Sequence, residues 1–382
     1  MRRLLRQFKA FFQKGDIWLL TLCLITSVFG LVIVASATNY LGSMRYIVVQ
    51  AVAICLGVVC YVFFTLVDIE ILAERRQLLT LFNVLFIGML LIWGIETGGN
   101  RSWLRFSFLP FDIQPAEICK FTFIIVIAKT MSIYQNKVSS LKCVSHISAQ
   151  LLLIVGMIVV ISKDAGVALT FVFIFCVIAY VGGVKIWWIL GGLGTVGAAA
   201  PYLWSHLMSN YQKERILMLF DPSIDPQGIG VRYQTKLSLR YFAGGGLTGQ
   251  GLFHGSMTQS GSIREQRNDF IFSVAGEELG MLGCILVLCL LLAIVLRCIY
   301  IGLKSPNYMN RLICIGIAAM LVSQVGVNVG MCLGVFPVVG LTLPFFSYGG
   351  SSIVTMFIAM GIVSGIKMHP APDVSAHYIR PY

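Results

Sequence analysis

The run IWLLTLCLITSVFGLVIVASA, residues 17–37, is apolar throughout and carries no charge. About 20 such residues let a helix cross the hydrocarbon core of a membrane. Nine further apolar runs follow, at about 46–67, 78–95, 115–133, 147–162, 165–182, 186–206, 270–300, 311–334 and 351–366. The sequence therefore predicts an all-α polytopic membrane protein with about ten transmembrane helices.

The composition excludes a soluble globular protein. Of the 382 residues, 58% are hydrophobic and 12% are charged, whereas soluble domains are about half apolar and a quarter charged. We expect one membrane domain over residues 1–382. The net charge of +12 would suggest nucleic acid in a soluble protein. Here the basic residues flank apolar runs, so membrane lipid is the expected partner and nucleic acid is not.

The basic residues also indicate the orientation of the chain. Residues 1–14 are typical of a cytoplasmic, basic juxtamembrane helix lying on anionic lipid, and no cleavage site follows them. With this end inside, the inner segments hold 15 basic residues. The short outer loops hold four: Arg45, Arg101, Arg105 and Lys163. The positive-inside rule then places both termini in the cytoplasm.

The cysteine and histidine residues do not suggest a disulfide framework or a zinc site. The chain has 11 Cys and five His, but no C-x-x-C pair and no histidine spacing suited to a metal. The large loop described next contains no cysteine.

A polar segment, residues 207–269, separates the seventh and eighth apolar runs. The topology makes it a large extracellular loop. A connection of this length in a compact protein is usually either functional or disordered. Its aromatic residues, among them Tyr211, Phe220, Tyr233, Tyr241 and Phe242, favour a packed structure.

Asp269 lies where this loop meets the next apolar run. One interpretation is that Asn268 or Asp269 caps the helix, since both residue types are favoured caps. The other is a carboxylate at the mouth of an intramembrane cavity, acting as a general base. A helix N-terminus favours the charged carboxylate, and desolvation opposes it. The sequence leaves this balance open.

Glu277 and Glu278 follow two turns later, roughly 12 Å deeper if the helix is regular. Carboxylates within a membrane are costly, so they must be paired, protonated or facing water. A functional cavity and a structural ion pair with a helix-borne cation are both open.

Glu117 and Lys120 lie three residues apart on the fourth run, so they share a helix face and can pair directly. The pair is either structural or part of the wall of a substrate cavity. Arg101, Trp103 and Arg105 lie just outside the third run. Arg and Trp are common interfacial anchors, and Arg also suits a pyrophosphate.

The uncharged stretch Phe336 to Ser352 has too many Pro and Gly residues for a plain helix. Irregular backbone at membrane depth is tolerated where protein buries it or where it lines a cavity. The stretch therefore predicts a re-entrant segment against a pocket, and its candidate lining residues are Ser347, Gly349, Gly350 and Ser351.

Several motifs together resemble the SEDS family (shape, elongation, division and sporulation), whose members include RodA and FtsW. They are Arg101-Ser102-Trp103, Gln114-Pro115-Ala116-Glu117-x-x-Lys120, Lys163-Asp164-Ala165-Gly166, the loop signature from Tyr211 to Gln234, Asn268-Asp269-Phe270-Ile271-Phe272 with Glu277-Glu278-x-Gly280, and Leu343 to Ser352. The resemblance covers nearly the whole chain. It departs at Ile263 to Arg267, which lacks the family's usual Pro and His.

The resemblance implies a peptidoglycan glycosyltransferase that polymerises lipid II at the outer face of the bacterial plasma membrane. Asp269 would be the catalytic base. The substrate-binding candidates, some of which would stabilise the undecaprenyl pyrophosphate leaving group with a divalent cation such as Mg or Mn, are Arg101, Trp103, Arg105, Glu117, Lys120, Arg215, Glu277, Ser347, Gly349, Gly350 and Ser351. The implied partner is a class B penicillin-binding protein.

The short termini favour the elongation (RodA) type over the division (FtsW) type. Two other classes of function remain open: a lipid II flippase, because translocation paths also use intramembrane charges, and a non-catalytic scaffold. A carboxylate at the outer mouth of a groove favours the enzyme.

Overall fold

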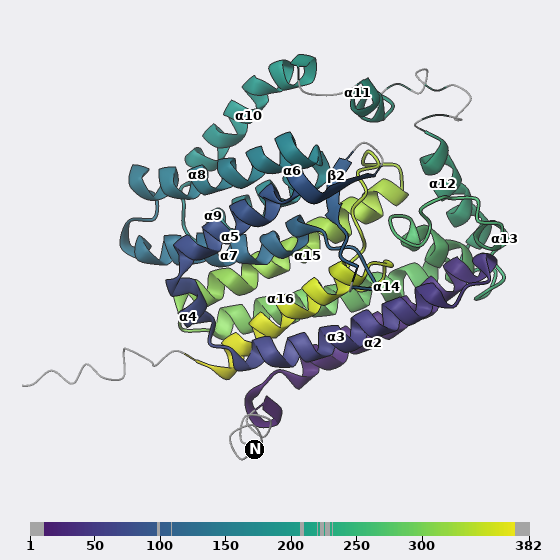
Figure 1. Ribbon diagram of the computed structural model, residues 1–382, viewed down its shortest axis with the longest axis horizontal. Coiled ribbons are helices and arrows are strands. Elements are labelled where there is room, and N and C mark those ends of the chain that lie inside the picture. The colour runs from purple at the N-terminus through teal and green to yellow at the C-terminus, as the bar shows by residue number, and fades with distance from the viewer. Residues whose placement is uncertain are drawn as a thin grey trace, which may run out of the picture.

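The computed structural model describes residues 11–97, 100–107, 109–206, 210–219, 221, 225, 230 and 232–370. Helices occupy all ten predicted positions, and all of them except α10 run roughly alongside one another (Figure 1). They are α2 (Ile17–Thr38), α3 (Arg45–Leu66), α5 (Arg76–Gly88) with α6 (Leu90–Trp93), α7 (Pro115–Ile133), α8 (Leu141–Met157) with the π-helical η3 (Ile158–Ser162), α9 (Ala165–Val181), α10 (Ile186–His206), α14 (Ile271–Lys304), α15 (Tyr308–Cys332) and α16 (Gly350–Met368).

Within the described residues, seven helical segments are long and apolar enough to cross a membrane by length and composition. The helix α9 is apolar but shorter, and α7 carries three charged residues, Glu117, Lys120 and Lys129. The prediction of a polytopic helical membrane protein is confirmed. The basic segment 1–14 falls mostly outside the described residues, and only its last part, residues 11–14, is seen, as helix.

The connections gather at two opposite ends of the bundle. At the end that we call the loop end lie α11 (Asn210–Leu217), α12 (Tyr233–Gly245), α13 (Ser256–Gln259) and the β-hairpin described below. At the opposite end, the α4 end, lie α4 (Ile69–Glu74), η2 (Gln135–Lys137) and the turn between α14 and α15. Asp16, before α2, is buried there and pairs with Arg297 of α14 at 2.7 Å and with Lys367 of α16 at 3.3 Å. These ion pairs tie three helices together at the α4 end.

A small antiparallel sheet corrects the expectation of a purely helical chain. β1 (Gly94–Thr97) pairs with β2 (Asn100–Leu104), with Ile95 opposite Trp103. The third apolar run was predicted to continue as helix to residue 95, but α6 ends at Trp93 and Gly94 is already extended. The chain leaves the bundle there, so the β-branched and aromatic side chains favour a strand.

A second correction concerns α14. Gly280 lies inside it with φ 67° and ψ −166°, which breaks the helix. Residues 281–304 alone are about 36 Å long at 1.5 Å per residue, enough to cross the membrane. The first part of α14 packs against α12 instead, where Gly276 meets the Phe242 ring and Ser238 bonds Ser273. Glu277 and Glu278 therefore belong to the part of α14 before the break, which packs at the loop end.

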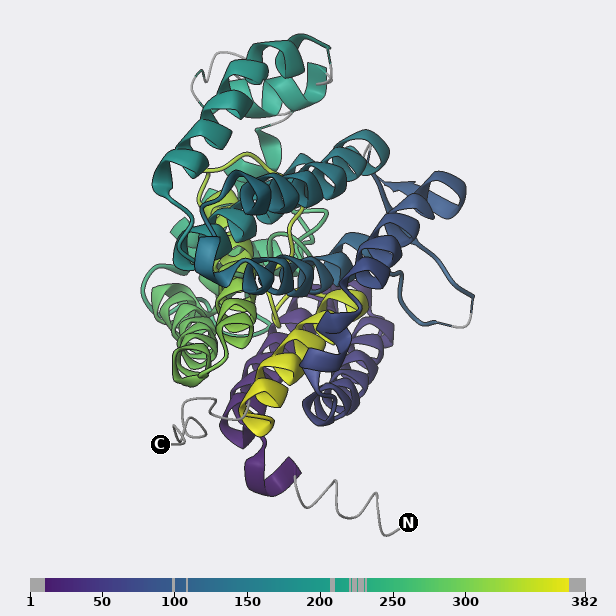
Figure 2. The same ribbon diagram turned by 90° about the vertical axis from the view of Figure 1, so that its left-hand side faces the viewer.

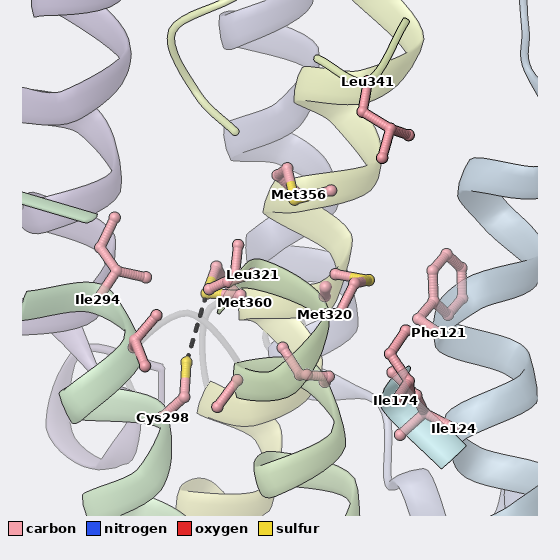
Figure 3. Packing of buried hydrophobic residues seen from close by; sticks show 14 of the residues in the cluster. Phe121, Ile124, Ile174, Ile294, Cys298, Met320, Leu321, Leu341, Met356 and Met360 are labelled. Atoms are coloured by element: carbon pink, nitrogen blue, oxygen red, sulfur yellow. Dashed lines mark hydrogen bonds between the residues drawn. The ribbon is translucent and has the colours of Figure 1, made fainter. Parts of the chain in front are cut away.

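The core of the bundle is apolar and sulfur-rich. Figure 3 shows Met320 of α15 and Met356 and Met360 of α16 among aliphatic side chains. The thiol of Cys298 lies 3.6 Å from the Met360 sulfur. Glycines let α3 and α16 approach closely, because a Cβ at Gly361 would lie 2.7 Å from the Tyr61 carbonyl oxygen. Small residues serve helix packing in membranes in this way.

The helix α10 extends away from the other helices in both views (Figures 1 and 2). Its packing against the described residues is chiefly with α9. Trp187 near its start is 77% exposed. The helix leads from the bundle into the large loop.

Candidate functional site

The Asn268–Asp269 pair is held from two sides at the loop end. The Asn328 Nδ2 of α15 donates to the Asp269 carbonyl oxygen at 2.8 Å. The Ser347 hydroxyl donates to the Asn268 carbonyl oxygen at 2.5 Å. Asn328 also donates to the Leu341 carbonyl oxygen at 2.6 Å. The backbone of Asn268 and Asp269 is thus fixed by α15 and by the segment that the sequence predicted to lie against a pocket, which we call the wall.

The Asp269 carboxyl has a strongly raised pKa. Burial raises its pKa from 3.8 to about 7, the nearby carboxylates Glu265 and Asp164 add to the rise, and Arg215 opposes it. Desolvation is therefore the largest influence on this carboxyl, and it favours the protonated form. A pKa near the working pH suits proton transfer.

The capping interpretation of Asn268 and Asp269 is wrong. Phe270 is the residue that precedes the first turn of α14, and within residues 232–370 no side chain caps that helix. The amide of Asn268 donates instead to Glu265 at 2.9 Å. Both side chains are consequently directed elsewhere than to the helix end.

Residues 333–349 have no regular secondary structure, as the Pro and Gly residues indicated. Arg215 donates to the Val338 carbonyl oxygen at 2.6 Å, so the large loop contacts this segment. Gln50 clamps it from α3: its amide nitrogen donates to the Ser347 carbonyl oxygen, and its amide oxygen accepts from the Gly349 N–H. The segment therefore connects Arg215, Asp269 and α3.

The predicted lining residues of this segment are mostly buried. Ser347 is 2% exposed, and its hydroxyl oxygen accepts from the Leu343 N–H. Ser351 accepts from the Gln114 N–H at 3.3 Å. A Cβ on Gly350 would lie 2.2 Å from the Phe111 ring. In this structure these residues hold the wall in place.

Glu117 and Lys120 form the predicted pair, with Nζ and Oε1 2.6 Å apart and both side chains buried. The Gln324 amide of α15 lies 3.4 Å from the second Glu117 oxygen. Asp164, before α9, has a pKa raised to about 6 by burial, and Lys120 is close enough to oppose that rise. The pair therefore extends the polar cluster from Asp269 and Asp164 into the bundle.

Arg101 and Arg105 lie at the same end on the hairpin, and both are exposed. Arg101 donates to the carbonyl oxygens of Gly94 and Leu91, and Arg105 makes two bonds to Asp112 at 2.9 and 2.8 Å. Trp103 is half-buried. The hairpin meets the polar cluster through Ser102, whose hydroxyl lies 2.6 Å from that of Ser162.

Glu277 and Glu278 are fully buried, and their partners are hydrogen-bond donors from the loop and, for Glu278, also from α2. Glu277 accepts from the N–H groups of Met257 and Thr258 at 2.9 and 2.8 Å and from the Thr258 hydroxyl at 2.6 Å. Glu278 accepts from Ser36 of α2 at 2.7 Å and from Gln259. These donors take the place of the predicted helix-borne cation. Glu277 holds the loop in this structure, and its predicted contact with substrate stays a prediction.

Sequence reasoning missed Asn328 and Gln50 as members of the site. The signal was present, because an amide inside an apolar run is expensive unless it is bonded. Asp164 was noticed only as part of a turn, and its closeness to Asp269 depends on the packing of α9 beside the 333–349 segment.

A metal ion was a further expectation. Within the described part of the chain, no three His, Cys, Asp or Glu side chains are grouped to hold one. Magnesium needs only one or two carboxylates when substrate phosphates supply the other oxygens. Asp164 and Asp269, which repel each other, fit that smaller requirement.

The fold and the site define a multi-pass helical membrane protein with a desolvated carboxyl beside a buried polar cluster at one end. The family model FtsW/RodA/SpoVE, described as "Cell cycle protein", matches residues 16–371. The chain belongs to this family, which confirms the resemblance seen in its motifs.

Three similar proteins show how far the likeness extends. The peptidoglycan glycosyltransferase MrdB of Escherichia coli K12 is 30% identical over 94% of this chain and 96% of its own. A probable peptidoglycan glycosyltransferase FtsW of Geobacter metallireducens is 30% identical over 93% and 95%. The structure described as "Structural coordination of polymerization and crosslinking by a peptidoglycan synthase complex" contains a chain with a TM-score of 0.80 and 29% identity, over 94% of this chain and 99% of that one.

Proposed function

We propose that the protein is a peptidoglycan glycosyltransferase that polymerises lipid II into glycan strands. The observation that carries the proposal is the Asp269 carboxyl, with its pKa raised to about 7, beside Arg215 and the 333–349 wall. The names of the relatives MrdB and FtsW support the same reaction class.

In the proposed reaction Asp269 accepts the proton of the acceptor's sugar hydroxyl as the hydroxyl oxygen attacks the anomeric carbon of the donor. The bond from that carbon to the pyrophosphate oxygen breaks, and the pyrophosphate leaves on its undecaprenyl chain. One base suffices for this direct displacement with inversion. Asn328 and Ser347 orient the base by fixing the backbone on both sides of it.

Cations would stabilise the charge that develops on the leaving pyrophosphate. Arg215 is the best placed of the three predicted arginines, because it affects the pKa of Asp269. Arg101 and Arg105 are exposed at the loop end, and they would guide the headgroup toward Asp269. A magnesium or manganese ion, which Asp164 would hold together with substrate oxygens, supplies further positive charge when bound.

The proposed setting is the bacterial plasma membrane, with the loop end outside and both termini in the cytoplasm. The similarity to a chain of a peptidoglycan synthase complex supports a class B penicillin-binding protein as partner. We propose the elongation role.

The test is polymer formation from fluorescent lipid II by the purified protein, with and without its class B partner, and with moenomycin to silence class A enzymes. Wild type should form polymer, and Asp269→Asn and Asp269→Ala should form none. The matched control is Glu214→Gln, an exposed carboxylate of α11. Polymer from both Asp269 variants would refute the proposed base. An inactive wild type in the presence of its partner would favour the flippase or scaffold classes.

A further inference from the structure

A groove lies at the α4 end, at the opposite end of the bundle from Asp269. Its volume is about 670 Å³, within the range of small-molecule sites. The end of α4, the start of α5 and the last turns of α7 line it. No step of the proposed reaction uses these residues.

The groove is lined by three cations and one carboxylate. The cations are Arg75, Arg76 and Lys129, and the carboxylate is Glu74, which bonds Lys129 at 2.5 Å. The Nη1 atom of Arg76 is buried and has no hydrogen-bond partner among the described residues. A buried donor without an acceptor is costly. The groove therefore has a surplus of positive charge, and one of its buried donors lacks an acceptor.

The same groove meets the first turn of α5. The first N–H groups of a helix have no intrahelical acceptor, and they carry a partial positive charge. In α5 these belong to Arg76, Gln77 and Leu78, all lining residues. No side chain caps this end within residues 69–93. Backbone and side-chain donors thus converge on one place, as they do at phosphate sites.

An apolar stripe continues from the groove along α5. Leu78, Leu81 and Leu85 are 58%, 51% and 60% exposed, and their spacing of three and four residues places them on one helix face. Ile133, on the other side of the groove, is 53% exposed. The donors therefore lie beside exposed apolar side chains. A phosphate that carries acyl chains can contact both, whereas a freely soluble phosphate can contact only the donors.

We propose that this groove binds the phosphate headgroup of an anionic phospholipid, whose acyl chains lie along Leu78, Leu81 and Leu85. The lipid belongs to the leaflet at the α4 end, which the proposed topology makes cytoplasmic. Basic pockets between transmembrane helices on that side suit anionic headgroups. The site is independent of the glycosyltransferase reaction.

The experiment is native mass spectrometry of the full chain titrated with phosphatidylglycerol, and with phosphatidylcholine as the zwitterionic comparison. The Arg75→Gln/Arg76→Gln variant should bind the tightest phosphatidylglycerol about 30-fold more weakly, at about fivefold per basic residue. The matched control, Lys137→Gln/Lys142→Gln, removes two exposed charges from the same end outside the groove, and it should keep wild-type binding.

A second variant tests the proposal in the opposite direction. Glu74→Gln removes the competing carboxylate and should tighten binding about fivefold. Equal losses in the arginine variant and in the control would overturn the site. So would competition by soluble glycerol phosphate at the lipid's own concentration, because that would make it a free phosphate site. None of these readouts depends on lipid II polymerisation, so failure of the proposed function leaves them interpretable.

Discussion

At the scale of single residues, the protonation of Asp269 should control the pH dependence of polymerisation. Only the carboxylate can accept a proton, and its pKa is about 7. The rate should therefore rise about tenfold per pH unit below pH 7 and level off above it. The measurement is the initial rate of polymer formation between pH 5.5 and 8.5. A rate that does not change through pH 7 would contradict the assignment.

Glu265 offers a control for that profile. Its negative charge contributes to the raised pKa of Asp269, so Glu265→Gln should lower that pKa and move the acid limb toward lower pH. A shift toward higher pH would contradict the electrostatic explanation.

The same carboxyl should reduce the stability of the folded protein at alkaline pH. The folded state holds this proton more tightly than the unfolded state, whose pKa is 3.8. The resulting stability is complete below pH 3.8 and is lost as the pH rises through about 7. Asp269→Asn, which cannot ionise, should therefore unfold at a higher temperature than wild type at pH 8, with a smaller difference at pH 5. Thermal unfolding in detergent measures this, and no gain at pH 8 would refute it.

The sequence correctly predicted a contact between side chains that are close together in the chain. Glu117 and Lys120 share a helix face, and they do form an ion pair. It could not show that Asp164 lies near Asp269, because 105 positions separate them and only the packed helices bring them together. Nor could it show that loop donors hydrogen-bond Glu277, since those donors depend on the fold of residues 245–260.

At the scale of elements, the break at Gly280 should be essential to the structure. Its φ of 67° disfavours any residue with a Cβ, and that atom would lie 2.4 Å from the Gly249 nitrogen. Gly280→Ala should therefore destabilise the protein by at least about 2 kcal/mol. The control is Gly326→Ala in α15, where the added methyl meets open space. That change should leave the unfolding temperature unchanged or raise it slightly. Similar unfolding temperatures for the two variants would contradict the strain argument.

The anchoring of the loop by Glu277 makes a second prediction about an element. Glu277→Ala removes the acceptor of three donors from Met257 and Thr258, and unpaired buried donors cost about 1–3 kcal/mol each. Amide hydrogen exchange in residues 250–260 should become faster, while exchange in α16 stays slow. Unchanged protection in the loop would show that other contacts hold it.

Hydrophobic runs located every long helix, because spanning a membrane requires about 20 apolar residues whatever the tertiary contacts. The hairpin and the break at Gly280 were not predicted. Each depends on contacts with residues that are distant in the sequence. The break at Gly280 packs against α12 and residues 247–249. The hairpin bonds Ile113 and Ser162.

At the scale of the whole molecule, the two ends of the bundle should face different compartments. Lys213 of α11 lies at the loop end and Lys137 of η2 at the α4 end. In intact cells a membrane-impermeant thiol reagent should label Lys213→Cys and spare Lys137→Cys, and permeabilised cells should show both. Wild type supplies the background from native cysteines. Labelling of Lys137→Cys alone in intact cells would invert the proposed topology.

The anchoring of residues 250–260 by Glu277 and Glu278 also bears on protein engineering. An outer loop is the usual place for an epitope tag, because surface loops tolerate insertions. Here the loop is bonded to the helix that begins two residues after Asp269. An insertion between His254 and Gln259 would therefore disturb the neighbourhood of the proposed base, and tags belong elsewhere on the chain.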